Sequence, residues 1–202
     1  MGKDFRDGFR SYVRTEVPAN NRKGRRVVYV YHGQMYHFAM TAHAFRALKA
    51  ELFVLSLIWA AVQVGVLCLP VPSNGTNLVT IPAFLALAAA AYVVYNALSF
   101  LTTKQDAPAW EYHAVNRALS GGTVVAMGLL AVALALHIGS QLFLVRVFVP
   151  LELVAMGGYL LCGTLAFWMR RQWRKVQVTS YHTDERAQAC LLYTSPSPRD
   201  TR

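Results

Sequence analysis

The chain has 202 residues, of which 55% are hydrophobic and only 15% charged, and its net charge is +10. Soluble domains average roughly 45–50% apolar and 25% charged residues, so this composition disfavours a soluble domain and favours a membrane protein. The positive charge alone would fit nucleic-acid binding. However, the cations cluster beside long apolar runs rather than along a folded, aromatic-bearing surface, which argues against that class of partner.

Residues 1–47 form a basic segment ahead of the first apolar run. Phe5, Phe9, Tyr12 and Val13 recur at helical spacing, with cations on the opposite face, so the pattern predicts an amphipathic helix at the membrane surface. The alternative is a basic disordered tail, because glycines interrupt the short pattern.

Two runs of β-forming residues follow at 27–31 and 34–38, separated by His32 and Gly33. This order is typical of a β-hairpin around a glycine turn. An isolated hairpin is marginal in water, so we expect it to lie on the helices, on lipid or on a partner. Thr41 is a predicted N-cap for a helix that continues into the first apolar run.

Four apolar runs occupy most of the domain at residues 48–169. They lie at about 50–69, 78–101, 118–139 and 147–169, and Pro82 is expected in the first turn of the second. A helix needs about 20 apolar residues to cross a bilayer, and its backbone groups must be paired within the segment. The sequence therefore predicts an all-α, polytopic membrane protein with four transmembrane helices.

Few polar side chains fall inside these runs. Glu152 lies near the start of the fourth run, where a helix N-terminus favours an anion and where Arg146 or His137 could pair with it. We expect a structural cap here, with a substrate or proton site as the alternative. Gln63 and Asn96 are expected to form hydrogen bonds between helices.

Small residues recur at close spacing and predict close helix packing, within the chain or in a homo-oligomer. These residues are Ala86, Ala90, Gly122, Ala126, Ala135, Gly139, Gly157 and Gly158.

The distribution of cations predicts the orientation, because Lys and Arg near span ends are retained on the cytoplasmic side. Of the twenty Lys and Arg residues, only Arg146 lies in the segments that the prediction places outside. Both termini are therefore expected in the cytoplasm. A basic cytoplasmic tail follows at 170–189. Anionic lipid headgroups are the expected partner of two clusters, Arg22, Lys23, Arg25 and Arg26, and Arg170, Arg171, Arg174 and Lys175.

No catalytic, phosphate-binding or paired-cysteine motif is present in the sequence, so we expect neither an enzyme nor a cofactor. His32, His37, His43 and His113 are the candidates for a metal site. Their spacing fits neither a helix face nor a strand face, so surface histidines are the preferred interpretation and metal binding the alternative.

The end of the chain differs in composition from the rest. The run Leu-Leu-Tyr-Thr-Ser-Pro-Ser-Pro-Arg-Asp within 190–202 resembles translated sequencing-adapter read-through, which implies that the natural C-terminus is missing. A Pro/Ser-rich disordered tail is the alternative.

The rest of the chain resembles short four-span inner-membrane proteins of bacteria, a general resemblance that carries no functional residues. It implies a multi-pass protein of the inner or plasma membrane. We expect a non-enzymatic anchor, scaffold or accessory subunit that binds a partner through its cytoplasmic N-terminal segment. The alternative is a small transporter or channel that uses Glu152, Gln63 and Asn96.

Overall fold

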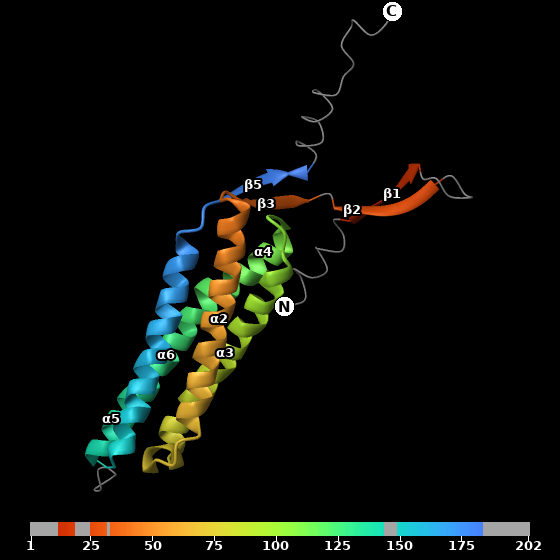
Figure 1. Cartoon of the computed structure of the whole chain (residues 1–202). Coiled ribbons are helices and arrows are strands. Elements are labelled where there is room, and N and C mark those ends of the chain that lie inside the picture. The colour runs from red at the N-terminus through yellow and green to blue at the C-terminus, as the bar shows by residue number, and fades with distance from the viewer. Residues whose placement is uncertain (1–11, 19–24, 32, 144–148, 184–202) are drawn as a thin grey trace, which may run out of the picture. The chain divides into compact units, whose positions relative to one another are not determined.

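The computed structural model describes residues 12–18, 25–31, 33–143 and 149–183, and the chain divides into two compact units (Figure 1). One unit, here called the bundle, comprises residues 40–103 and 114–177. The other, here called the sheet unit, comprises residues 1–39, 104–113 and 178–202. The predicted N-terminal helix lies mostly outside the described residues, and the tail at 190–202 lies wholly outside them.

The bundle contains the long helices α2 (Ala42–Leu67), α3 (Asn77–Thr102), α5 (Thr123–Phe143) and α6 (Pro150–Arg174). A short 3-10 helix, η1 (Pro72–Gly75), joins α2 to α3. Among the described residues, four helical segments are long and apolar enough to cross a membrane, and each overlaps one of the four predicted runs. Helix α3 packs between α2 and α5, and α5 packs on α6. Helix α6 also packs on α2, which closes a ring of four helices.

Local sequence sets the ends of these helices. The Thr41 hydroxyl accepts a hydrogen bond from the Ala44 amide at 3.3 Å, which confirms the predicted N-cap of α2. The prediction for Pro82 is wrong, because α3 begins at Asn77 and Pro82 lies beyond its first turn. There Pro82 cannot donate to the Leu78 carbonyl.

The third apolar segment is longer than predicted. Helix α4 (Ala109–Asn116) leads through a π-helical turn, η2 (Arg117–Gly122), into α5, so that the helical segment runs from Ala109 to Phe143. The Ser120 hydroxyl donates to the Asn116 carbonyl in this turn. A π-helical turn is wider than an α-helical one, so it rotates the side chains before it around the helix axis relative to those after it.

Small residues line the inside of the bundle and large apolar residues cover its outside. Ala83, Ala86, Ala90, Ala126 and Ala133 are fully buried. Many Leu, Ile, Val and Phe side chains are half exposed or more, including those of Leu78, Ile81, Phe84, Leu85, Val125, Leu153, Leu160 and Phe167. This arrangement is typical of helices that pack closely in lipid.

The small-residue prediction is confirmed for part of the set. A Cβ at Gly122 would lie 3.2 Å from Val93 Cγ2, and one at Gly158 would lie 2.1 Å from Val66 Cγ2. A Cβ at Gly139 or Gly157 would meet nothing within 4 Å. Those two glycines and the exposed Ala135 therefore do not serve packing within the chain.

The described residues of the sheet unit form five short strands, so the chain is mostly helical but not all-α. Strand β1 (Tyr12–Pro18) pairs with β2 (Arg25–Tyr31) in an antiparallel ribbon. Strand β3 (Gln34–Phe38) lies between β4 (Asp106–Pro108) and β5 (Val178–His182), antiparallel to both.

The predicted hairpin is therefore wrong in its pairing, although both of its strands exist. The segments at 27–31 and 34–38 lie in β2 and β3, which pair with other strands and not with each other. The reason is that β2 pairs with the strand before it, β1, while both edges of β3 are occupied by the distant strands β4 and β5. The last residues of the predicted amphipathic helix, Tyr12 to Arg14, belong to β1 and are extended.

Candidate functional site

The most strongly buried polar cluster in the described part of the chain is centred on Glu152, in the first turn of α6. One carboxylate oxygen, Oε1, accepts from the Ser73 amide at 3.2 Å. The other, Oε2, accepts from the Ser73 hydroxyl at 2.5 Å and lies 2.8 Å from His137 Nε2. The side chains of Glu152 and His137 are fully buried, and Ser73 is buried as well.

The pairing of Glu152 with His137 was one of the two predicted arrangements, while Arg146 lies outside the described residues. The cluster connects η1 to α5 and α6 through the Ser73 amide and the side chains of all three residues. Its geometry does not fit a nucleophile and base pair, since Ser73 Oγ and Glu152 Oε2 both face the same histidine nitrogen, at 3.4 and 2.8 Å. A catalytic histidine would use one nitrogen for each. The contacts therefore link η1, α5 and α6 at one point.

Several other buried polar atoms have no hydrogen-bond partner in the structure. They include His137 Nδ1, the Tyr159 hydroxyl, Gln63 Oε1 and Trp59 Nε1. The rings of His137 and Tyr159 meet edge to face, with centroids 6.0 Å apart. Buried polar atoms are costly when unpaired, so each of these groups carries a free-energy cost.

The other two predicted polar residues differ in their contacts. Gln63 Nε2 donates to the Ala83 carbonyl at 3.2 Å, so the predicted hydrogen bond between α2 and α3 is confirmed. Asn96 Nδ2 donates to the Tyr92 carbonyl at 2.8 Å, one turn earlier in α3. The prediction that Asn96 joins two helices is therefore wrong. Within the described part of the chain, no hydrogen bond links Gln63, Asn96 and Glu152.

The sheet unit has a polar cluster of its own. Asp106 Oδ1 lies 2.8 Å from His37 Nδ1 and accepts from the Tyr181 hydroxyl at 3.0 Å. These residues belong to β4, β3 and β5, so the cluster crosses all three strands. The His37 and Asp106 side chains are about one-third exposed, at 35% and 38%, which makes this a surface ion pair when the imidazole is protonated.

Aromatic side chains gather beside this cluster. Tyr36 stacks on Tyr112 with ring centroids 4.2 Å apart, and the Tyr36 hydroxyl lies 3.4 Å from His113 Nε2. Phe38 is buried and meets Tyr112 edge to face. Trp110 on α4 is 37% exposed. We call Tyr36, Trp110, Tyr112 and His113 the aromatic patch.

The candidate metal-binding histidines that the structure describes have different surroundings. His37 pairs with Asp106 and His113 contacts Tyr36, whereas His43 lies on α2. His32 falls outside the described residues. Among the residues that the structure describes, no group of three or more His, Cys, Asp or Glu side chains is placed to hold a metal ion.

The basic residues after the fourth span lie at the end of α6. Arg171, Arg174 and Lys175 are exposed, and Arg170 is partly so. Nearby, Glu51 on α2 accepts from Trp168 Nε1 at 3.4 Å and from Gln172 Nε2 at 3.2 Å. Of the N-terminal cations, Arg22 and Lys23 lie outside the described residues, while Arg25 and Arg26 form the start of β2.

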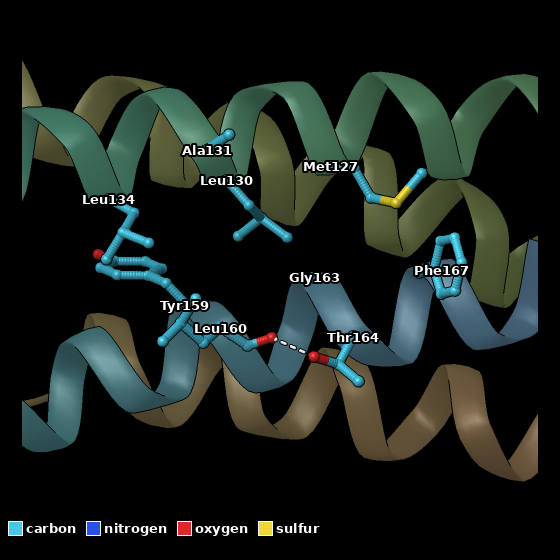
Figure 2. Close-up of a pocket in the computed structure, with 9 residues that line it drawn as sticks. All are labelled: Met127, Leu130, Ala131, Leu134, Tyr159, Leu160, Gly163, Thr164 and Phe167. Atoms are coloured by element: carbon cyan, nitrogen blue, oxygen red, sulfur yellow. Dashed lines mark hydrogen bonds between the residues drawn. The ribbon is translucent and has the colours of Figure 1, made fainter.

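A groove of about 320 Å³ runs between α5 and α6 on the surface of the bundle (Figure 2). Its walls are almost entirely apolar, and Tyr159 and Leu134 lie at one end while Met127 and Phe167 lie at the other. Gly163 contributes no side chain, and the Thr164 hydroxyl donates to the Leu160 carbonyl. The groove thus offers shape and hydrocarbon contact, with little polar recognition inside it.

Sequence reasoning missed Ser73, Asp106, Tyr181 and the groove. Ser73 stands in a turn-forming cluster, and its spacing gives no sign that it meets Glu152. Asp106 is the only acid between the second and third apolar runs before Glu111, which is a weak signal for a specific partner.

No protein-family model matches the chain, and no curated protein or solved structure is similar to it at a significant level.

Proposed function

We propose that the chain is a multi-pass membrane anchor or accessory subunit whose four long helices cross the bilayer and whose sheet unit docks a protein partner in the cytoplasm. The large exposed apolar side chains of all four helices support the first part. Ile81, Phe84 and Leu85, for example, are between 53% and 59% exposed on one helix. Such a surface is stable in hydrocarbon and would aggregate in water.

The observation that carries the proposal is the pairing of β3 with β4 and β5. Strand β3 precedes α2, β4 follows α3, and β5 follows α6. Two long helices separate each strand from the next, so an even number of crossings returns each segment to the same side of a membrane. The pairing supports an arrangement in which these three segments share one compartment. The cation distribution favours the cytoplasm, and the general resemblance favours a bacterial inner membrane.

The aromatic patch is the proposed docking surface. Trp110 and His113 are exposed, and Tyr36 and Tyr112 are partly exposed. Aromatic residues are enriched at protein interfaces, whereas a sheet that only joined loops would need no exposed tryptophan. The patch combines Tyr36 of β3 with residues of α4, so partner binding depends on the assembled unit and not on residues 1–47 alone.

Transport has less support than anchoring. Both oxygens of Glu152 are already engaged by Ser73 and His137, and Asn96 is engaged within its own helix. A substrate or proton path would require breaking the cluster that connects η1, α5 and α6. We therefore treat Glu152 and Gln63 as structural residues.

Chemical crosslinking in native membranes tests the docking role. The tagged full chain is compared with a Trp110→Ala/His113→Ala variant and with Thr179→Ala. Thr179 is an exposed residue of β5 that pairs with His37, so its side chain lies on the face of the sheet opposite to Tyr36. We expect a specific crosslinked protein that the double variant loses at least tenfold and that the Thr179 variant keeps. Equal recovery from all three chains, or no crosslinked protein, would contradict the proposal. Circular dichroism of the purified variants controls for misfolding.

A further inference from the structure

We propose that the groove between α5 and α6 binds an acyl chain of an anionic glycerophospholipid from the cytoplasmic leaflet, with its phosphate group at Arg171 and Arg174. This inference rests on the proposed function, because it requires the four helices to cross a bilayer. It adds a defined lipid site to what would otherwise be general contact between cations and headgroups.

The shape of the groove fits a hydrocarbon chain. Its walls come from residues 127–134 of α5 and 159–167 of α6, so it is about 10–12 Å long at 1.5 Å per residue. That length is close to one leaflet of a hydrocarbon core that is roughly 30 Å thick. The groove is open because Ala131 and Gly163 are small. The larger side chains of Met127, Leu160 and Phe167 form its walls.

The charge at one end of the groove fits an anionic headgroup. On α6, Leu160, Thr164 and Phe167 line the groove, and Arg171 follows Phe167 by one helical turn on the same face. Arg174 follows Arg171 by three residues, and both arginines are exposed. Guanidinium groups bind phosphate well because their geometry matches it. The opposite end of the groove, at Tyr159 and Leu134, has no cation nearby on either helix.

The depth of the groove also selects the cytoplasmic leaflet. If the hydrocarbon edge lies just before Arg170, then about 20 residues of α6 cross the core and its midpoint falls near Tyr159. Residues 159–167 then occupy the half of the core that is next to the arginines. A lipid chain entering from the arginine end would end close to the midpoint, as a chain of that leaflet does.

Two glycines on α6 make a matched test possible. A Cβ at Gly163 and a Cβ at Gly157 would each meet nothing within 4 Å, so leucine fits at both positions without a clash at the Cβ. Only Gly163 lines the groove. Gly163→Leu therefore fills the groove, whereas Gly157→Leu adds the same side chain to α6 elsewhere. Arg171→Gln removes the headgroup contact, and Arg46→Gln is its control on α2.

The experiment titrates the detergent-purified full chain with phosphatidylglycerol or phosphatidylcholine of identical acyl chains, and native mass spectrometry counts bound lipid. We expect phosphatidylglycerol to bind at least fivefold more tightly than phosphatidylcholine. Arg171→Gln should weaken phosphatidylglycerol binding about fivefold, the effect of one basic residue at a membrane surface. Gly163→Leu should weaken it at least tenfold, because several methylene contacts are lost. Gly157→Leu and Arg46→Gln should bind as the unmodified chain does.

Equal binding by the Gly163 and Gly157 variants, or equal binding of the two lipids, would overturn the inference. So would a dimer in the same spectra that Gly163→Leu abolishes while no lipid is bound, since a second copy would then fill the groove. Failure of the proposed function is distinguishable. If the Trp110→Ala/His113→Ala variant keeps every crosslinked protein but binds phosphatidylglycerol normally, only the docking role is wrong. A chain recovered outside membranes would end both proposals.

Discussion

His137 Nε2 lies 2.8 Å from Glu152 Oε2, and neither side chain is exposed. The two residues stand on different helices, and Ser73 in η1 donates to the same carboxylate through both its amide and its hydroxyl. Ser73 and His137 together engage both oxygens of this carboxylate, and the contact fixes the orientation of the imidazole. The cluster therefore acts as one unit, and its members should respond jointly to substitution.

We expect His137→Leu and Glu152→Gln each to destabilise the bundle by about 1–3 kcal/mol, because each leaves a buried polar partner without its hydrogen bond. The double variant should lose less than the two single losses together, because neither residue is then left facing an unmatched partner. Unfolding of the purified chain in mixed micelles, followed by circular dichroism, gives all three values. Glu51→Gln is the control, since its carboxylate is exposed and should contribute about 1 kcal/mol or less. If the double variant loses as much stability as the two single variants together, the contact between His137 and Glu152 contributes no coupling energy.

Two adjacent glycines on α6 should respond differently to alanine. At Gly158 the new Cβ would lie 2.1 Å from Cγ2 of Val66, which is buried and β-branched, so α2 and α6 must move apart. We expect Gly158→Ala to cost about 1–3 kcal/mol. Gly157→Ala meets nothing and should be neutral or stabilise the helix by up to about 1 kcal/mol. The same unfolding assay measures both, and equal stabilities would contradict the tight packing of Val66 against α6.

The four long helices were predictable because length and hydropathy alone define them. The hydrogen-bond partners of the buried polar residues on these helices were harder to predict. The sequence indicated that Glu152 would need a partner and offered His137, but Ser73 lies 79 positions away in a loop that reads only as a turn. Gln63 and Asn96 looked equivalent in sequence, yet one bonds to a neighbouring helix and the other to its own. Helix rotation decides this, and composition does not specify it.

The sheet was recognised only in part for a related reason. Alternation of residue types identified the segments of β2 and β3, but strand pairing is set by which segments the helices bring together. β4 has only three residues, and β5 follows a long helix, so neither gives a clear signal in the sequence. The pairing of Met35 with both Pro108 and Tyr181 depends on the completed fold.

The carboxylate of Asp106 should stabilise the sheet modestly. It faces His37 Nδ1 and accepts from the Tyr181 hydroxyl, which joins β4 to both other strands. We expect Asp106→Asn to cost about 0.5–1 kcal/mol, since both side chains of the pair are about one-third exposed and solvent screens them. Amide hydrogen exchange should be faster in Val178–His182 of the variant and unchanged in α2. Unchanged exchange in both segments would show that the strands do not depend on this contact.

Cysteine labelling tests the arrangement of the helices in a membrane. Cys68 is exposed just after α2, and Cys162 is buried inside the bundle. With Cys190 replaced by Ser, we expect a membrane-impermeant maleimide to label Cys68 from outside intact cells and to leave Cys162 unmodified. In a second chain, Cys68→Ser is combined with Ser180→Cys at an exposed position of β5. This chain should react only after the membrane is permeabilised, because one pass of α2 separates Cys68 from the compartment of the sheet. Labelling of both positions from the same side would show that α2 does not cross the bilayer.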